Sequence, residues 1–124
     1  MAKALVVDDS RAVRMLLVKA LKQLGYEVQE AANGREALEI IEAGNSGITL
    51  VLADWNMPEM NGLDLLKRLR QNFALSSLAV VMVTTETEIE QIAEAMEAGA
   101  NEYVMKPFTQ DILMEKLQLA GIHP

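Results

Sequence analysis

Cysteine is absent from the chain, and a single histidine, His123, stands next to the last residue. Without cysteine there is no disulfide, no thiolate nucleophile and no cysteine-ligated zinc or iron–sulfur site. One histidine is too few for a histidine-based catalytic triad or a multi-histidine metal site. Any catalytic or metal-binding chemistry therefore has to come from carboxylates, hydroxyls and amines.

Positive charge is also scarce, and long hydrophobic runs are missing. Eleven basic against eighteen acidic residues give the 124-residue chain a net charge of −7. That balance argues against nucleic acid as a ligand, because phosphate binding needs a basic surface. The apolar run Ala4–Val7 stops at two aspartates, far short of the roughly 20 residues that span a bilayer. We therefore expect a cytoplasmic monomer that contacts neither nucleic acid nor membrane.

Glycine and proline number only seven and three, which excludes a collagen-like or proline-rich disordered chain. The length fits one domain over residues 1–124. Within it, short β-branched runs alternate five times with helical patterns. Strands are predicted at Lys3–Val7, Glu27–Glu30, Ile48–Ala53, Leu78–Thr84 and Glu102–Met105. Helices are predicted at Ser10–Leu24, from Asn33 to a stop at Gly44, and at Gly62–Asn72, Glu88–Ala98 and Gln110–Leu119.

This alternation predicts an α/β fold. Continuous apolar strands separated by helices are typical of a parallel sheet that is covered on both faces and joined by right-handed crossovers. Asn33 and Thr109 are expected to cap the helices that follow them. The apolar spacing predicts that Leu16 faces the core from the first helix and Leu63 from the third.

Polar side chains follow four of the predicted strands. Asp8 and Asp9 follow the first strand, Asp54 ends the third, Thr84 ends the fourth, and Lys106 follows the fifth. In open α/β sheets, ligands bind beyond the carboxyl ends of the strands. An aspartate after a strand is often only a helix cap. Three carboxylates, a hydroxyl and an ammonium from separate strands nevertheless converge on one edge, which favours a functional site.

The chemistry of this group points to a divalent cation. Neighbouring carboxylates repel one another unless a cation is present. Hard oxygen ligands with room for water suit Mg²⁺ or Mn²⁺, and magnesium completes its shell with water and phosphate oxygens. The residues therefore predict phosphoryl transfer, with a carboxylate as the nucleophile and the metal and a lysine neutralising the phosphoryl oxygens.

Four motifs carry a resemblance to a known family. They are LVVDD at Leu5–Asp9, DWNMPEMNG at Asp54–Gly62, MVT at Met82–Thr84 and YVMKPF at Tyr103–Phe108. In this order and spacing they resemble the receiver domain of two-component response regulators, in particular its CheY-like single-domain members, over essentially the whole chain. The resemblance implies a flavodoxin-like (βα)₅ fold with strand order 2-1-3-4-5. It also implies a protein that catalyses its own aspartyl phosphorylation and dephosphorylation rather than a conventional enzyme.

The resemblance assigns the acceptor and the metal ligands by position. Asp54 resembles the phosphoacceptor, which would become a 4-aspartylphosphate. Asp9 and Asp54 resemble the Mg²⁺ ligands, together with the backbone carbonyl of Asn56. Asp8 resembles the acid that holds a metal-bound water. The peptide bond of Lys106–Pro107 is similar to one that is cis in the family.

The resemblance also assigns a switch. Thr84 resembles the switch hydroxyl, Lys106 the ammonium that pairs with the phosphoryl group, and Tyr103 the aromatic residue whose rotamer reports the switch. Asn56 and Glu86 occupy the positions that tune the rate of dephosphorylation in the family. Both are polar, and neither would shield the phosphoryl group from water as a bulky apolar residue would.

The family implies two kinds of partner. A sensor histidine kinase supplies the phosphoryl group, and a downstream protein target or phosphatase binds the face made by the fourth helix, the fifth strand and the fifth helix. From Glu86 to Glu102 the chain has six acidic residues and no basic one. Because like charges hinder association, we expect a basic or apolar partner on this face rather than an acidic peptide.

Four alternatives compete with this interpretation. A haloacid-dehalogenase-type phosphatase also uses an aspartate nucleophile, but it needs a second aspartate where Asn56 stands. A flavodoxin-type FMN carrier needs a phosphate-binding loop after the first strand, where Asp8 and Asp9 would repel phosphate. A receiver domain cut from a larger regulator, and a receiver that works as a non-phosphorylated interaction module, stay open.

Overall fold

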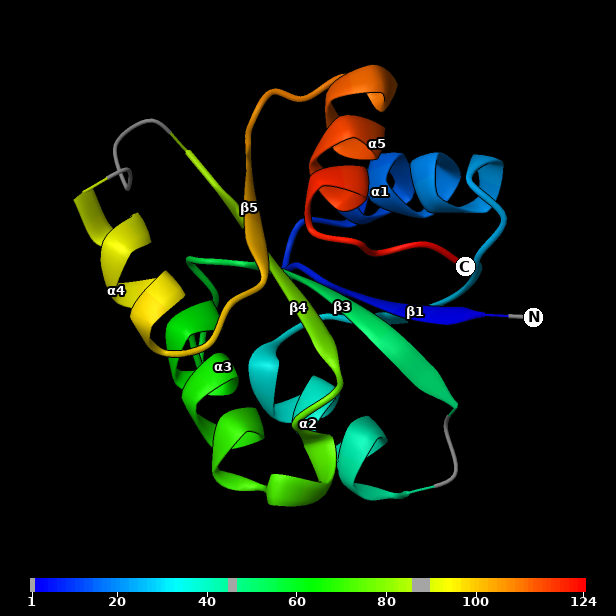
Figure 1. Cartoon of the computed structure of the whole chain (residues 1–124). Helices are drawn as coiled ribbons and strands as arrows, with labels where there is room; N and C mark the ends of the chain where they lie inside the picture. The colour runs from blue at the N-terminus through cyan, green and yellow to red at the C-terminus, as the bar shows by residue number, and fades with distance from the viewer. Residues whose placement is uncertain (1, 45–46, 86–89) are drawn as a thin grey trace.

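Five parallel strands form one sheet in the order β2-β1-β3-β4-β5, as predicted (Figure 1). The structure, a computed structural model, describes residues 2–44, 47–85 and 90–124. The strands are β1 (Lys3–Val7), β2 (Glu27–Ala31), β3 (Ile48–Asp54), β4 (Ala79–Thr84) and β5 (Glu102–Met105). The helices are α1 (Arg11–Gln23), α2 (Gly34–Glu42), α3 (Gly62–Gln71), α4 (Ile92–Glu97) and α5 (Gln110–Leu119), and a 3-10 turn, η1, spans Phe73–Leu75.

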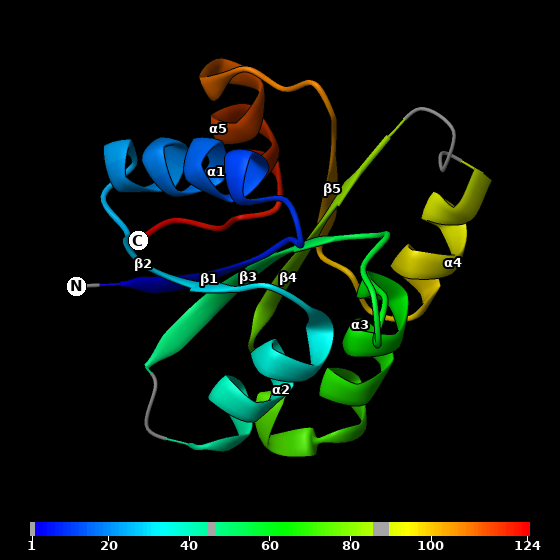
Figure 2. The same cartoon turned by 180° about the vertical axis from the view of Figure 1, so that it is seen from behind.

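The helices cover both faces of the sheet. Helices α1 and α5 lie on one face, and α2, α3 and α4 lie on the other (Figures 1 and 2). Side chains alternate along each strand, so both faces of a covered strand must be apolar. On β1, Ala4 and Val6 belong to the core under α1 and α5, whereas Leu5 and Val7 belong to the core under α2 and α3. This double burial explains the continuous apolar runs in the sequence.

Four of the five helices begin at a polar cap. The side chains of Ser10, Asn33, Asn61 and Thr109 each accept a hydrogen bond from the backbone N–H three residues further on, at 2.8 to 3.3 Å. Such a bond satisfies one of the N–H groups that the first helical turn leaves without a partner. The predicted caps at Asn33 and Thr109 are therefore confirmed.

The described part of the predicted fourth helix is α-helical only over Ile92–Glu97. The described α-helix begins at Ile92, and Glu90 and Gln91 ahead of it form a tighter 3-10 turn. Gln91 at the N-cap position makes no side-chain capping hydrogen bond. The start of this α-helix is therefore not stabilised by a side-chain cap, unlike the starts of the other four. Glu88 and Ile89, where the prediction placed the first turn, lie outside the described residues.

One predicted core position, Leu16, is corrected, and another, Leu63, is only partly buried. Helix α1 meets the sheet through Leu17, Ala20 and Leu21, and Leu16 is 60% exposed because it is rotated by about 100° from Leu17. In α3 the fully buried leucines are Leu65, Leu66 and Leu69, and Leu63 is only half-buried against the core. The apolar spacing in the sequence is compatible with more than one buried helix face. Contact with the sheet decides which face is buried. Among the described residues, no helix is long and apolar enough to cross a bilayer.

One arginine ties together the amino-terminal end of the sheet. The Arg70 guanidinium donates to the backbone carbonyls of Gly99 at 3.0 Å, Leu75 at 3.0 Å and Leu78 at 2.7 Å. It also donates to the Asn101 side chain at 3.0 Å, and Asn101 in turn accepts from the backbone of β4 at 2.9 Å. These contacts join α3, η1, β4 and the turn between α4 and β5. Burial disfavours the charged guanidinium and lowers the pKa of Arg70. The four acceptors offset this cost by hydrogen-bonding to the charged group.

The Arg70 network predicts a large loss of stability for a conservative substitution. Arg70→Lys cannot satisfy four acceptors from one ammonium, and we expect it to lower the free energy of unfolding by about 2 kcal/mol or more. Urea denaturation measures this value. The control Arg68→Lys, at an exposed position of the same helix, is expected to stay within about 0.5 kcal/mol of the parent. An Arg70→Lys protein as stable as the Arg68→Lys protein would contradict this account.

Candidate functional site

The polar residues at the strand ends meet at one edge of the sheet. Strands β1, β3, β4 and β5 are consecutive neighbours, so the residues at their carboxyl ends are brought side by side. Oxygen atoms of Asp8, Asp9 and Asp54 all lie within 4.8 Å of one another. Asp8 and Asp54 are buried, whereas Asp9 is exposed to solvent. The predicted carboxylate cluster is therefore present and is open to solvent on the Asp9 side.

A single ammonium bridges two of these carboxylates. Lys106 Nζ lies 2.9 Å from Asp54 Oδ1 and 3.1 Å from Asp8 Oδ2. The Lys106 backbone N–H donates to the Thr84 carbonyl at 2.7 Å, which fixes the lysine against the end of β4. The bond of Lys106 to Pro107 is cis, as the resemblance implied. The cluster thus has one positive charge against three carboxylates.

These contacts shift the pKa values at the site. Burial raises the pKa of the Asp54 carboxyl, and the charges of Asp8 and Asp9 raise it further, against the opposing effect of Lys106. For Lys106, burial acts to lower the pKa, but hydrogen bonds and charge attraction from Asp54 and Asp8 outweigh it, and the pKa is raised. Lys106 is therefore held as an ammonium, and the ionised form of Asp54 is disfavoured until more positive charge arrives.

Asp8 has further contacts besides Lys106, and sequence reasoning missed them. Its Oδ1 accepts from the Ser10 backbone N–H at 2.8 Å, and its backbone carbonyl accepts from Arg14 Nη1 at 2.7 Å. Arg14 also pairs with Glu30 on β2 at 3.1 Å. A positive charge in the first turns of a helix opposes the helix dipole, so its presence there was a signal of a specific partner.

The oxygen atoms of this cluster suit a divalent metal. All three candidate side-chain ligands are carboxylates, which hard cations such as Mg²⁺ and Mn²⁺ prefer. Burial, with a smaller contribution from the Asp8 and Asp9 charges, raises the pKa of Asp54, so its ionised form gains from a nearby cation. Asn56 lies exposed two residues after Asp54. The role of its backbone carbonyl as a further ligand remains a prediction.

Gly62 allows the loop after Asp54 to fold back on the end of β3. Its backbone N–H donates to the Trp55 carbonyl at 2.9 Å. A Cβ at this position would overlap the Asp54 carbonyl oxygen and would lie 2.7 Å from Met82 Cε. Only glycine fits such a close backbone approach without displacing the acceptor strand. This close approach explains why a glycine ends the DWNMPEMNG motif.

The two predicted switch residues lie on neighbouring strands. Thr84 is fully buried at the end of β4, and its hydroxyl donates to the Thr85 carbonyl at 3.4 Å. Tyr103 is half-buried on β5, opposite Met82 of β4 in the strand register. Lys116 lies over the Tyr103 ring, a contact that sequence reasoning did not identify. Glu86, predicted to tune the dephosphorylation rate, lies outside the described residues.

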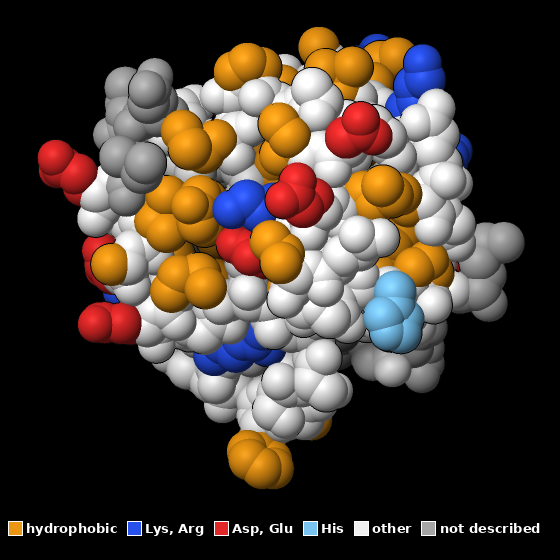
Figure 3. Space-filling model, turned by 45° about the horizontal axis from the view of Figure 1, so that its top comes forward, with side chains coloured by type: hydrophobic (Ala, Val, Ile, Leu, Met, Phe, Trp, Pro, Cys, Tyr) orange, Lys and Arg blue, Asp and Glu red, His pale blue; other side chains and the backbone are white. Residues whose placement is uncertain are grey.

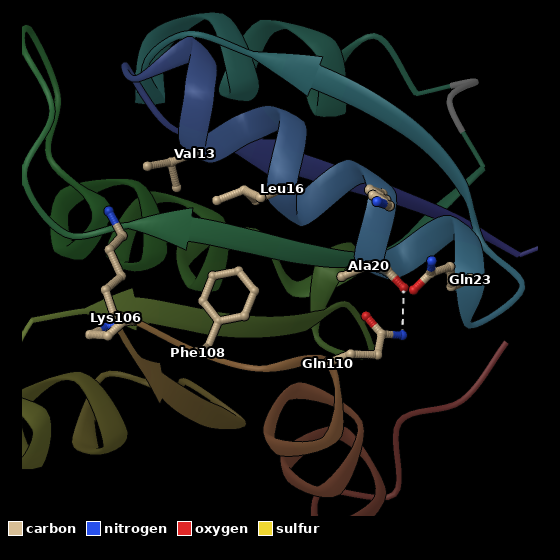
Figure 4. A pocket seen from close by; sticks show the side chains of 9 residues that line it. Val13, Leu16, Ala20, Gln23, Lys106, Phe108 and Gln110 are labelled. Atoms are coloured by element: carbon tan, nitrogen blue, oxygen red, sulfur yellow. Dashed lines mark hydrogen bonds between the residues drawn. The ribbon is translucent and has the colours of Figure 1, made fainter.

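An apolar hollow of about 550 Å³ lies beside Lys106, between α1 and the segment after β5. Val13 and Leu16 point from α1 toward Phe108, and Gln110 donates to the Ala20 carbonyl at 3.1 Å (Figure 4). Leu16 thus lines this hollow instead of the core, which explains its exposure. Figure 3 turns this end of the molecule toward the viewer and shows groups of hydrophobic side chains on its surface.

Comparison with known proteins agrees with this geometry. The response regulator receiver domain family matches residues 4–118. Chemotaxis protein CheY1 of Helicobacter pylori is 45% identical over 118 residues, which cover 94% of each chain. A CheY homologue of Campylobacter jejuni is 42% identical over 117 residues, covering 94% of this chain and 89% of the relative. The solved structure of CheY4 of Vibrio cholerae superimposes with a TM-score of 0.86 at 37% identity, covering 97% and 98% of the two chains.

The electrostatics of the cluster predict that neutralising Asp54 stabilises the metal-free protein. Because the pKa of Asp54 is raised on folding, its ionised form costs stability at neutral pH, and this cost disappears as the pH falls through the raised pKa. Asp54→Asn keeps an acceptor for Lys106 and removes the charge. We expect its Tm in EDTA at pH 7 to exceed that of the parent by a few degrees, with a smaller difference at pH 4.

The matched control for this prediction is Asp111→Asn, at an exposed position of α5. This change removes a charge from the first turn of a helix and is expected to leave Tm unchanged or slightly lower. Thermal unfolding in EDTA followed by circular dichroism measures all three proteins. If Asp54→Asn lowers Tm as much as Asp111→Asn does, the carboxylates do not repel one another as described.

Proposed function

Since the chain belongs to the response regulator receiver domain family, we propose that it is the phospho-accepting regulator of a chemotaxis-type two-component pathway. A sensor histidine kinase supplies the phosphoryl group, Asp54 accepts it, and the modified protein binds a downstream target or phosphatase. The observation that carries this proposal is the Lys106 ammonium held between Asp54 and Asp8 beside the exposed Asp9. We further propose that it works as a monomer in the cytoplasm.

The proposed reaction is an in-line phosphoryl transfer to a carboxylate. An Asp54 carboxylate oxygen forms a bond to phosphorus as the bond from phosphorus to the donor imidazole nitrogen breaks, and the imidazole leaves with the electron pair. Lys106, already 2.9 Å from Asp54, pairs with the negative phosphoryl oxygens as they arrive. Thr84 at the end of β4 donates its hydroxyl to the same group. Water later cleaves the acyl phosphate and restores the free carboxylate.

We propose Mg²⁺ as the resident cation, with Mn²⁺ as a substitute. Asp9, Asp54 and the Asn56 backbone carbonyl would hold it directly, and Asp8 would hold one of its waters. When bound, it supplies positive charge to the phosphoryl oxygens. The exposure of Asp9 supports this assignment, because solvent access leaves room for the waters that magnesium retains. Lys106, 2.9 Å from Asp54, supplies the other positive charge.

The face made by α4, β5 and α5 is proposed to read out phosphorylation. Movement of Thr84 toward the phosphoryl group would open space behind it, and Tyr103 would swing inward to fill that space. The half-burial of Tyr103 and the 40% exposure of Met96 support a face whose apolar area depends on the Tyr103 position. We also propose that Asn56 and Glu86 leave the acyl phosphate open to water, so that the signal is short-lived.

We propose that the partner on this face is basic or apolar rather than acidic. Glu90 and Glu97 are exposed on it, and Glu94 is paired with Lys67 at 3.5 Å. Lys116 on α5 is already engaged with Glu102 at 3.6 Å. An acidic partner would thus meet exposed carboxylates and a lysine whose charge is largely compensated, which costs binding energy and slows association.

The proposed reaction predicts one phosphorylation site. Incubation with acetyl phosphate and Mg²⁺ is expected to add one phosphoryl group to the parent protein by intact mass. Asp54→Asn is expected to add none, because the amide is not a nucleophile, and EDTA is expected to prevent the reaction in the parent. Asp64→Asn, at an exposed position of α3, serves as the control and is expected to react like the parent.

The same sample tests the lifetime after the donor is removed. We expect the phosphoryl group to be lost within seconds to minutes at 25 °C, since polar residues occupy both rate-tuning positions. Modification of Asp54→Asn at the parental rate would refute Asp54 as the acceptor. A half-life of many hours would refute only the roles of Asn56 and Glu86.

The charge of the α4 face predicts the preference between two probe peptides. Both carry the same apolar residues at helical spacing, one with lysine and the other with glutamate at its polar positions. We expect the lysine peptide to bind the beryllofluoride-activated protein about tenfold more tightly, with the difference shrinking as salt is added. Fluorescence titration measures both affinities.

Charge-reversal variants supply the test and its control. Glu94→Lys with Glu97→Lys is expected to abolish the preference for the lysine peptide. Glu39→Lys with Glu42→Lys makes the same change in net charge on α2 and is expected to preserve it. An equal loss in both double variants would show that net charge, rather than the α4 face, sets the preference.

A further inference from the structure

Lys116 of α5 contacts both residues at the start of β5. Its Nζ lies 3.9 Å from the centroid of the Tyr103 ring and 3.6 Å from Glu102 Oε1. The same Oε1 accepts a hydrogen bond from the Tyr103 backbone N–H at 2.9 Å. One carboxylate oxygen therefore anchors both the ammonium and the backbone of the residue whose ring the ammonium covers.

The position of β5 in the sheet makes this arrangement possible. β5 is the outermost strand beside β4, so α5 can reach around its free edge. Along β5, Val104 faces the core under α1 and α5, whereas Tyr103 packs against the core under α3 and α4. Lys116 extends from α5, on the face of the sheet that α1 and α5 cover. It contacts the ring of Tyr103, which packs on the opposite face of the sheet. It is thus a direct contact between α5 and the switch residue.

We infer that Lys116 is a positioning residue that holds the Tyr103 ring, in the unphosphorylated protein, in the half-buried position that it has here beneath the ammonium, called the outer position below. The inference rests on the proposed function, in which Tyr103 swings inward on phosphorylation. A cation over an aromatic ring at a partly exposed site favours the covered position by about two- to fivefold. Inward movement breaks this contact, so the latch formed by Lys116 and Glu102 sets how far the resting protein populates the active position.

Glu102 makes the latch reversible. The side chains of Glu102 and Lys116 are only 17% and 26% exposed, so their ion pair is less screened by solvent than a surface pair. When the Tyr103 ring leaves, the ammonium keeps its carboxylate partner and stays at the edge of β5. The covering cation is then in place when the ring returns after dephosphorylation.

Rotamer populations of Tyr103 test the latch without any partner protein. The chain has only two tyrosines, and the ring of the other, Tyr26, is buried beneath α1 and α5 and reports an intact fold. Three-bond couplings to the Tyr103 ring carbon measure its χ1 population by NMR. In Lys116→Met, which keeps an apolar stem but no charge, we expect the ratio of inward to outer rings to rise about two- to fivefold.

Three further proteins make this result specific. Lys116→Arg is expected to match the parent, because a guanidinium also binds an aromatic face. Glu102→Gln is expected to shift Tyr103 in the same direction as Lys116→Met, and it decides the test if Lys116→Met does not fold. Lys67→Met removes another ion-paired lysine, one that contacts Glu94, and is expected to leave Tyr103 unchanged.

Beryllofluoride with Mg²⁺, a mimic of the phosphoryl group, separates the two possible failures. If it leaves the Tyr103 ring of the parent in place, the proposed switch is wrong and the latch has no role. If it moves the ring in the parent, but Lys116→Met and Glu102→Gln have parental populations without it, the latch is refuted and the proposed function stands. A shift in Lys67→Met equal to that in Lys116→Met also refutes the latch.

Discussion

The salt bridge from Lys106 to Asp54 and Asp8 is the interaction on which the site depends. Three carboxylates at one sheet edge repel, and burial of Asp54 and Asp8 strengthens that repulsion by lowering the local dielectric. One ammonium reduces the excess charge without removing it. Lys106 thus stabilises the carboxylate cluster, and the remaining negative charge favours the arrival of a cation. This is the electrostatic condition that a phosphoryl-transfer site requires.

Rigidity is unequally distributed around this edge. At the opposite end of the sheet, Arg70 ties Gly99 and Asn101, which follow α4, to α3 and β4. Helix α4 is therefore anchored at its C-terminal end, whereas its N-cap residue, Gln91, makes no side-chain capping bond. Within the part of the chain that the structure describes, the end of α4 without a side-chain anchor is the end nearer the carboxylates. In the proposed switch, a helix held in this way would respond to the site mainly through its first turn.

What could be predicted from the sequence follows from rules that act locally or through topology. Caps such as Asn33 and Thr109 need only a few neighbouring residues, and strand order alone brings Asp8, Asp54 and Lys106 together. Contacts between distant segments were not predictable. Arg70 meets Gly99 across 29 residues of sequence, and Lys116 meets the ring of Tyr103 around a sheet edge. The exposure of Leu16 belongs to the same class, because it depends on which stripe of α1 the sheet selects.

The proposed acceptor and the proposed readout face are connected through two neighbouring strands, β4 and β5. Lys106 and Thr84, the two side chains proposed to contact the phosphoryl group, are joined by a backbone hydrogen bond of 2.7 Å. Tyr103 precedes Lys106 by three residues on the same chain segment. In the proposed switch, a displacement at Thr84 would therefore reach Tyr103 through the neighbouring strands β4 and β5. Packed cores resist gradual deformation and favour discrete alternatives, so a side chain at the free edge of the sheet is the part of this fold best placed to adopt two positions.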